Sequence, residues 1–120
     1  HKRMNLLLAV LEKKCAKPFS FHDVFLKTAG GLRVDEPAAD LGICMALVSS
    51  MDEKTAARRT VYIGEVGLDG ELRPVSYMQE RISEAEKLGF ETIVVPKSKK
   101  KFFVKKARLE PFARVQDLVV

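Results

Sequence analysis

The stretch DEPAADLGICMALVSS, residues 35–50, is the most apolar part of the chain and begins with a proline among acidic residues. Pro37 disfavours helical geometry at Glu36 and is itself suited to the first position of a helix. A carboxylate of Asp35 or Glu36 can accept hydrogen bonds from the free N–H groups of that first turn. The stretch therefore predicts a capped helix. Because only Asp40 is charged after the proline, most of the helix circumference should be buried.

Three β-strands are predicted after this helix. The segment TVYIGEV, residues 60–66, has the β-branched content of a strand, and EVGLDGELRPV, residues 65–75, folds back as a hairpin. The pair Asp69-Gly70 supplies the positive φ angles of a tight hairpin turn. The segment TIVVP, residues 92–96, is short and wholly apolar, which is typical of a strand inside a sheet.

A second helix is predicted for SYMQERISEAEKLGF, residues 76–90, between the hairpin and TIVVP. Ser76 and Gln79 have the S-x-x-Q spacing of a capping box at its start. Gly89 followed by Phe90 suits a helix C-terminus with its apolar contact. The inward-facing stripe at helical spacing consists of Met78, Ile82, Ala85 and Leu88.

The N-terminal segment KRMNLLLAVLEKKC, residues 2–15, has apolar residues at helical spacing. Leu6 and Val10 add a second apolar face, which fits equally a helix inside the domain and one shared with a neighbouring subunit. Pro18 is expected to end this helix. Further along, FHDVFLKT, residues 21–28, alternates apolar and polar residues as a half-buried strand does, and AGGLRV, residues 29–34, is expected to form a turn. The C-terminal EPFARVQDLVV is expected to be a last strand that leads into a helix.

The composition predicts one globular domain over residues 1–120, because 47% of the residues are hydrophobic and no repeat or linker divides them. The net charge of +5 is unevenly distributed. Residues 1–34 carry seven Lys/Arg against two acids and residues 92–120 eight against two, whereas residues 35–91 carry six against twelve. The lysine segment KSKKKFFVKK, residues 97–106, holds six lysines. Such a block is either a solvated surface loop or the electrostatic footprint of a protein that binds phosphate backbones.

Several classes of site have no signature in the sequence. Cys15 and Cys44 lack C-x-x-C spacing, so we expect reduced thiols in a cytoplasmic protein. A zinc site needs four ligands, and the two cysteines and two histidines do not have the spacing of zinc ligands. The glycines of AGGLRV match neither nucleotide-binding loop. No apolar run is long enough to span a membrane and no secretion leader opens the chain. Because residue 1 is His1 and not Met, we expect a piece of a longer polypeptide.

The succession DEPAADLGICMALVSS, YIGEVGLDGELRPVSYMQERISEAEKLGF and TIVVP resembles the proteolytic domain of Lon, a serine–lysine peptidase. The resemblance implies an α/β (α+β) domain with the Lon proteolytic-domain-like fold, also called ribosomal protein S5 domain 2-like. In that family the serine lies in a D-G-P-S-A-G turn and the lysine in G-G-L-K-E-K. Ala38 and Gln79 stand at these two positions, so neither a nucleophile nor its general base is present. Glu36 and Asp40 replace two glycines of the first motif.

A narrower resemblance covers nearly the whole chain. The segments HKRMNLLLAVLEKK, AGGLRVDEPAADL and GEVGLDGELRPV are similar to the C-terminal Lon-like domain of the RadA (Sms) family of bacterial DNA-repair proteins. This resemblance implies a non-proteolytic module that forms a hexameric ring and follows a zinc finger and a RecA-like ATPase in a branch-migration motor. ATP, magnesium and zinc would belong to those other domains, so no cofactor or metal is expected in these 120 residues.

Three hypotheses of function remain open at this point. The first is a scaffold that forms a homo-oligomeric ring and contacts DNA without sequence specificity. The second is an active serine-type peptidase with an unorthodox nucleophile, and the third is a purely structural oligomerisation domain. The candidate DNA-binding residues are Arg3, Arg33, Lys99, Lys100, Lys101, Lys105 and Lys106. Because an FFV run after lysines usually anchors in a core, duplex DNA is expected to bind at least as well as single strands.

Overall fold

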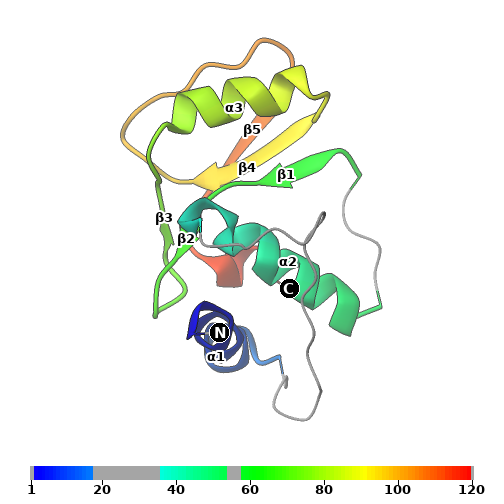
Figure 1. Ribbon diagram of the computed structural model, residues 1–120, viewed down its shortest axis with the longest axis vertical. Helices are drawn as coiled ribbons and strands as arrows, with labels where there is room; N and C mark the ends of the chain where they lie inside the picture. The colour runs from blue at the N-terminus through cyan, green and yellow to red at the C-terminus, as the bar shows by residue number, and fades with distance from the viewer. Residues whose placement is uncertain (1, 18–35, 54–57, 120) are drawn as a thin grey trace.

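The computed structural model describes residues 2–17, 36–53 and 58–119, which form one mixed α/β domain with a parallel sheet. Figure 1 shows that α3 covers one face of the sheet, and that α2 and then α1 lie on the other side. The helices are α1 (Lys2–Cys15), α2 (Asp40–Met51) and α3 (Met78–Lys87), with 3₁₀ turns η3 (Pro37–Ala39) and η4 (Val115–Asp117). The strands are β1 (Thr60–Tyr62), β2 (Glu65–Val66), β3 (Leu72–Arg73), β4 (Thr92–Pro96) and β5 (Arg108–Phe112).

The central strand is β4, which pairs in parallel with β1 on one side and β5 on the other. All five of its residues are buried, which confirms the prediction of a strand inside a sheet. Ile93 and Val95 pack into an apolar cluster with α3, whereas Val94 packs into a second cluster with α1 and α2. The alternation explains why residues 93–96 are all apolar, because each face of the strand meets a covered side of the sheet. Thr92, the polar first residue, is buried as well, and its hydroxyl accepts a hydrogen bond from Arg108 at 3.1 Å.

The strand predicted over residues 60–66 is interrupted around Gly64, so β1 and β2 belong to different sheets. The Gly64 N–H donates to the Ala38 carbonyl at 3.0 Å, and the Gly64 carbonyl accepts the Leu41 N–H at 3.1 Å. A Cβ at this position would lie 2.9 Å from Cγ of Pro96, so the close approach requires glycine. The prediction of one continuous strand is wrong here because the backbone bonds to the η3–α2 junction instead.

The hairpin predicted from EVGLDGELRPV is present as the antiparallel pair β2–β3. Its turn differs from the prediction, because Gly70 has a positive φ of 82° whereas Asp69 does not. The Gly67 N–H donates to the Glu71 carbonyl at 2.9 Å, and the Gly70 N–H donates to the Gly67 carbonyl at 2.9 Å. The connection is therefore a longer loop that ends in one left-handed glycine, and not a two-residue turn with two positive φ angles.

The helix predicted at the acidic proline turn is present as η3 continuing into α2. Glu36 caps it, because its carboxylate accepts a hydrogen bond from the Ala38 N–H at 3.3 Å, and Pro37 occupies the first helical position. The buried residues of α2 are Asp40, Leu41, Cys44, Leu47 and Val48. Ala46 and Ser50 are exposed, so less of the circumference is buried than the sequence predicts.

The predicted N-terminal helix is confirmed as α1. The residues of its inner face that are fully buried are Leu7, Val10 and Leu11. Of the second apolar face predicted from Leu6 and Val10, Val10 is thus buried in the core and Leu6 is half-buried. The helix ends at Cys15, and Ala16 has a left-handed φ of 56°. Pro18, the predicted strand FHDVFLKT and the turn AGGLRV lie outside the described residues.

The helix predicted over residues 76–90 is present as α3, but its start differs from the prediction. Ser76 does not cap it; the N-cap residue is Tyr77 in a left-handed conformation (φ 60°, ψ 38°), with no side-chain cap. The buried stripe contains Met78, Ile82 and Ala85, as predicted. Leu88, the fourth predicted member, is 70% exposed because the helix ends before it. The C-terminus is confirmed: Gly89 has a φ of 96° and the Phe90 N–H donates back to a helix carbonyl at 3.2 Å.

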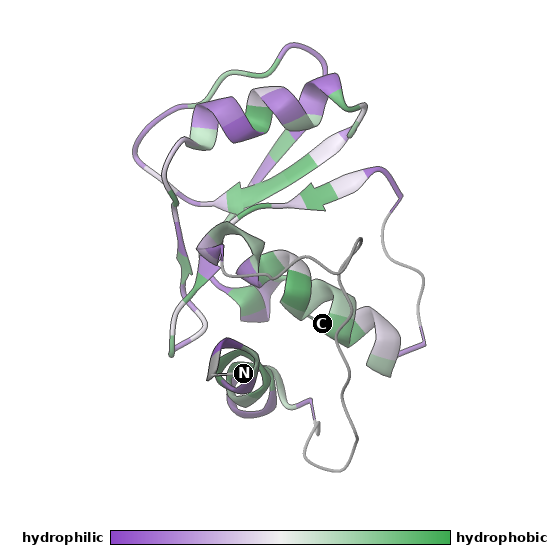
Figure 2. Ribbon diagram, viewed as in Figure 1, coloured by the Kyte–Doolittle hydropathy of each residue, from purple (hydrophilic) through white to green (hydrophobic). Residues whose placement is uncertain are grey.

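The C-terminal segment confirms the last strand, β5, but the helix predicted after it is only the short η4 turn. Val115 in this turn is fully buried in the cluster with α1 and α2. Figure 2 shows apolar colour along β4 and hydrophilic colour on the outer side of α3. The two buried clusters, one on each face of the sheet, form the core of the domain.

Candidate functional site

The two positions that the resemblance matches to the peptidase dyad, Ala38 and Gln79, lie on η3 and α3. Ala38 is 7% exposed and belongs to the same apolar cluster as Met78, the first residue of α3. Its methyl group carries no reactive atom, and its carbonyl accepts the Gly64 N–H at 3.0 Å. The η3 turn therefore serves as a packing and connecting element.

Gln79 has both ends of its side-chain amide occupied. Its Oε1 accepts the Phe103 N–H at 2.8 Å, and its Nε2 donates to the Phe103 carbonyl at 2.9 Å and to Ser83 Oγ at 3.1 Å. A primary amide matches the donor and acceptor of a main-chain residue in this way, whereas a lysine ammonium has no acceptor. Gln79 thus fixes the lysine segment to α3, a role different from the capping box that its spacing predicts.

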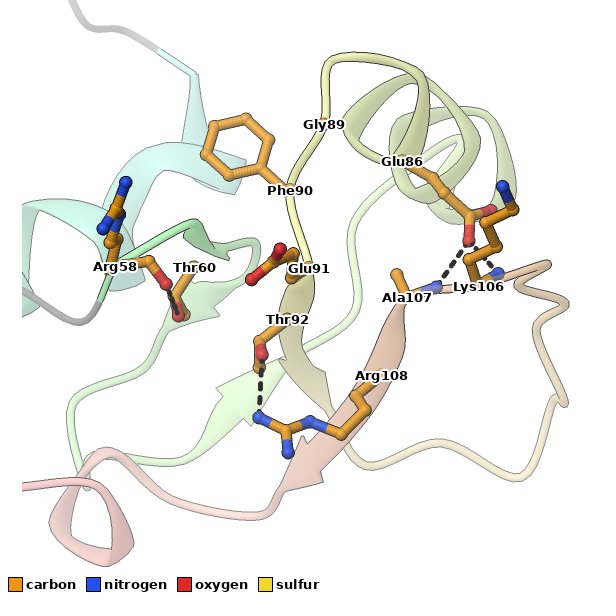
Figure 3. A pocket seen from close by; sticks show the side chains of 10 residues that line it. All are labelled: Arg58, Thr60, Glu86, Gly89, Phe90, Glu91, Thr92, Lys106, Ala107 and Arg108. Atoms are coloured by element: carbon orange, nitrogen blue, oxygen red, sulfur yellow. Dashed lines mark hydrogen bonds between the residues drawn. The ribbon is translucent and has the colours of Figure 1, made fainter.

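Glu86, further along α3, holds the end of the lysine segment. Its carboxylate accepts the N–H groups of Lys105 at 3.0 Å, of Lys106, and of Ala107 at 2.7 Å. Figure 3 shows the carboxylate turned toward this stretch of backbone. The three donors, with the Lys105 N–H first, hold the pKa of Glu86 below its ordinary value. Sequence reasoning missed Glu86 because its partners are main-chain groups, which leave no side-chain pattern.

The lysines of the segment extend from a backbone that is held at these two places. All six lysines of the segment are exposed: Lys97 and the five candidate DNA-binding residues Lys99, Lys100, Lys101, Lys105 and Lys106. Phe102 and Val104 are half-buried in the cluster on the α3 side, whereas Phe103 between them is 67% exposed. The prediction that the FFV run is anchored in the core is therefore confirmed for two residues and wrong for Phe103.

Arg3, the basic candidate in α1, is bound by two carboxylates. Its guanidinium donates to both oxygens of Asp40, through Nε at 2.8 Å and through Nη2, and to Glu65 at 3.2 Å. Asp40 is 1% exposed and also accepts the Val66 N–H at 3.0 Å. The Asp40 hydrogen bond raises the pKa of Arg3. Since α1 and α3 lie on opposite sides of the sheet (Figure 1), the structure does not bring Arg3 together with the lysines; Arg33 lies outside the described residues.

An ion pair connects the η3 turn to α3. Nη2 of Arg81 lies 2.7 Å from Oε1 of Glu36, and Nε of Arg81 donates to the Ser76 carbonyl at 2.8 Å. The Arg81 hydrogen bond, followed by that of the Ala38 N–H, holds the pKa of Glu36 below its ordinary value. The Glu36 carboxylate therefore joins η3 to α3, the two elements on which Ala38 and Gln79 lie.

Two hollows border the lysine segment. The first, of about 570 Å³, lies between the start of α3 and the lysines, and its lining includes Tyr77, Gln79, Lys100, Lys101 and Phe102. The second, of about 770 Å³, lies at the amino ends of β1, β4 and β5 (Figure 3). Its charged lining residues are Arg58, Glu86, Glu91, Lys106 and Arg108. Both hollows present cationic side chains, which can contact phosphates, but each also has carboxylates in its lining: Glu80 in the first, and Glu86 and Glu91 in the second.

Within residues 2–17, 36–53 and 58–119, no group of three or more His, Cys, Asp or Glu side chains is arranged to hold a metal ion. Across the same ranges, no helix has both the length and the apolar character needed to cross a membrane. Both cysteines are free thiols. Burial raises the pKa of Cys44 to about 12, with smaller contributions from Asp40 and Cys15.

Residues 9–99, from within α1 through β4 into the lysine segment, match the model of a protein family described as subunit ChlI of Mg-chelatase. This match covers more than half of the 120 residues, so the chain belongs to that family.

Individual relatives carry the name DNA repair protein RadA. The chain is 45% identical to RadA of Streptococcus pyogenes serotype M3 over 96 residues, which cover 80% of the chain and 21% of the relative. It is 44% identical to RadA of Brucella abortus over 118 residues, covering 98% of the chain and 25% of the relative. It is 45% identical to RadA of Synechocystis over 97 residues, which cover 81% of the chain and 19% of the relative. The chain thus spans about a fifth to a quarter of the length of these relatives.

Proposed function

We propose that the chain is a non-proteolytic, Lon-like scaffold domain of a cytoplasmic DNA-repair protein of the RadA type. In this role it forms a homo-oligomeric ring and holds DNA on a basic surface during branch migration. Relatives from different bacteria share the RadA name at 44–45% identity, which supports the DNA-repair assignment. The replacement of both dyad positions by Ala38 and Gln79 supports a role without peptidase chemistry. ATP hydrolysis and zinc binding are implied only for domains outside these 120 residues.

The observation that carries the proposal is how the lysine segment is held. Gln79 and Glu86 bind main-chain atoms of Phe103, Lys105, Lys106 and the following alanine. These contacts fix the path of the backbone and leave the ammonium groups exposed. Lysines on an ordered backbone can contact phosphates without reading base edges, so the expected binding is independent of sequence.

The test is fluorescence anisotropy with duplex DNA across a salt series. Lys99→Glu, Lys100→Glu and Lys101→Glu together should weaken binding strongly. They should also reduce the slope of log K against log salt, because each phosphate contact contributes about 0.9 to that slope. The matched control changes three exposed cations elsewhere, Lys13, Lys87 and Arg114, to Glu, with the same change in net charge. An equal loss in both variants would mean that net charge, and not the lysine segment, governs binding.

The absence of peptidase activity is tested with unfolded protein and peptide substrates, for which we expect no turnover. Ala38→Ser together with Gln79→Lys should still be inactive as a peptidase. The lysine would lose the acceptor for the Phe103 N–H, and the carboxylates of Glu36 and Asp40 remain beside the turn where an oxyanion would form. Hydrolysis that survives purification and is blocked by serine-directed inhibitors would contradict the proposal.

Ring assembly is tested by sedimentation velocity. Because basic and acidic regions alternate along the chain, head-to-tail subunits should meet basic surface to acidic surface. The resemblance to the RadA family implies six subunits. We expect association that increases with protein concentration and weakens with salt. A strict monomer at high concentration and low salt would show that this chain alone does not form the ring.

A further inference from the structure

Tyr77 is an exposed aromatic residue in a strained backbone position. Its side chain is 70% exposed, and its φ of 60° lies in the left-handed region that L side chains disfavour. It stands at the second glycine of the G-G-L-K-E-K pattern, where glycine would remove the strain. In the part of the chain that the structure describes, its phenol makes no hydrogen bond. Among the described residues, neither packing nor hydrogen bonding accounts for the tyrosine. Backbone strain of this kind is typical of functional positions.

The surroundings of Tyr77 combine apolar and cationic groups. Tyr77 lines the groove of about 570 Å³ together with Lys100 and Lys101, both exposed. The less exposed lining residues Met78 and Phe102 belong to the apolar cluster on the α3 side, so they form the floor of the groove. One carboxylate, that of the exposed Glu80, also lines the groove, so its charged lining residues are two cations and one anion. An apolar floor with an aromatic wall and a net positive charge fits a ligand that has both flat apolar surfaces and negative charges.

A second exposed aromatic residue is bound through its backbone by Gln79, which lines the same groove. Phe103 is 67% exposed, and its N–H and carbonyl are both bound by Gln79, two residues after Tyr77 in the chain. The Gln79 contacts therefore set the position of Phe103 relative to the start of α3. Phe103 itself does not line the groove, whose aromatic lining residues are Tyr77 and Phe102.

We infer that this groove binds single-stranded nucleic acid, with Tyr77 stacking on an unpaired base and Lys100 and Lys101 at the phosphates. Bases in a duplex are already stacked on one another, whereas unpaired bases present their faces to aromatic side chains. The inference rests on the proposed DNA contact and adds the kind of strand that is bound. The inference replaces the expectation that duplex DNA binds at least as well as single strands. That expectation required Phe103 to be buried, whereas it is 67% exposed.

The experiment compares two oligonucleotides of equal charge with the 120-residue chain. One is oligothymidylate of about 12 nucleotides, and the other is an abasic strand of the same length, which keeps the phosphates and lacks the bases. Wild type should bind oligothymidylate roughly tenfold more tightly, as expected for stacking of a base. Tyr77→Asn should remove this preference while binding of the abasic strand is unchanged. Tyr77→Phe should keep the preference, because the ring is retained.

The stability of the variants separates function from folding. Asparagine tolerates the left-handed region, so Tyr77→Asn should melt at or above the wild-type temperature although it loses the base preference. Leu88→Ala, which changes another 70% exposed residue at the far end of α3, should alter neither property. Should Tyr77→Asn melt at a lower temperature than wild type, the base preference of Tyr77→Phe is compared with that of Tyr77→Leu. Both variants keep a bulky side chain, but only Tyr77→Phe keeps the aromatic ring.

Three results would overturn the inference. One is equal affinity of wild type for the two oligonucleotides, and another is an unchanged base preference in Tyr77→Asn. The third is binding of a polyglutamate peptide that oligothymidylate does not displace, which would assign the groove to an acidic protein segment. If one of these results is obtained but duplex DNA binds in a manner that depends on Lys99, Lys100 and Lys101, the proposed function stands and only this inference fails. If neither duplex nor single strand binds, both fail.

Discussion

The two faces of the parallel sheet are covered in different ways. On the α1–α2 face, twelve buried residues among those described form one apolar cluster, and Arg3 bonded to Asp40 ties α1 to α2. On the α3 face, the described cluster has eight buried residues. The lysine segment beside it is attached to α3 through hydrogen bonds of Gln79 and Glu86. One face is held mainly by burial, and the other carries a segment that polar side chains hold by its backbone.

This difference separates the part of the domain that supplies stability from the part proposed to bind DNA. Apolar burial stabilises by about 25 cal/mol per Å² and needs no particular hydrogen-bond geometry. A hydrogen bond contributes about 1 kcal/mol net, so an attachment made of a few of them can open while the core stays folded. We therefore expect variants on the α1–α2 face to change the free energy of unfolding. Variants at the lysine segment should change local order and binding.

The largest effect is expected for Leu41→Ala, on the α1–α2 face. Leu41 has no exposed surface, so its truncation should lower the free energy of unfolding by about 3 to 4 kcal/mol through lost burial and the cavity left behind. Denaturant titration measures this value. Leu68→Ala, at a site that is 71% exposed, is the control and should stay within about 0.5 kcal/mol of wild type. A similar cost for both would mean that this cluster does not carry the stability.

The next largest effect is expected for Arg3→Met, which keeps an apolar stem and removes the charge. Asp40, 1% exposed, would then be left as a buried carboxylate without its cation, at a cost of about 3 kcal/mol. The companion variant Arg3→Met with Asp40→Asn removes both charges and should recover part of the loss. A double variant that loses the sum of the two single changes would show that the two side chains are not coupled.

A smaller effect is expected for Gln79→Ala at the lysine segment. The Phe103 N–H and carbonyl would lose their partners at an exposed site, so the free energy of unfolding should fall by about 1 kcal/mol. Hydrogen exchange at Phe103 should accelerate, while exchange in β4 follows only the small global change. If Gln79→Ala destabilised the domain as much as Leu41→Ala, the distinction between the two faces would fail.

The smallest effect is expected from acidification of Glu86. Its backbone donors hold its pKa below the ordinary value of 4.5, so the charged form is favoured in the folded state. The attachment of the lysine segment through Glu86 is therefore complete at any pH above the ordinary pKa, and it is lost as the pH falls through the lowered pKa of the folded state. NMR titration of the Lys105, Lys106 and Ala107 amide signals should show that midpoint. The Glu86→Gln variant should lack it, and a midpoint at or above the ordinary value would contradict the assigned hydrogen bonds.

The sequence predicted those elements whose cause is local or periodic. The capped turn at Glu36 and Pro37, the apolar strand β4 and the glycine-terminated end of α3 all follow from residue type and spacing. The break of residues 60–66 did not, because it depends on hydrogen bonds from Gly64 to residues that are distant in sequence. Leu88 fits the inward stripe by spacing, yet the helix stops before it, and element ends are set by such contacts.

The candidate site was predictable only in its charges. The lysine segment stands out in the sequence, whereas the residues that hold it do not. Gln79 and Glu86 contact main-chain atoms, and any carboxylate or amide on the polar face of α3 would look the same in a sequence. Arg3 illustrates the opposite case, since its positive charge was assigned to DNA but Asp40 and Glu65 bind it. Charge composition cannot tell a free cation from a paired one.

Attachment through main-chain atoms also determines which substitutions the lysine segment can accept. Gln79 and Glu86 contact the backbone of the exposed positions 103, 105 and 106, so any amino acid with an N–H group can occupy these three positions and keep the same hydrogen bonds, whereas Ala107 is buried. Proline alone would break them. The chemical character of this surface can therefore diverge among descendants of one ancestor while the backbone keeps its path. The same property makes positions 105 and 106 suitable for grafting new binding side chains onto an unchanged scaffold.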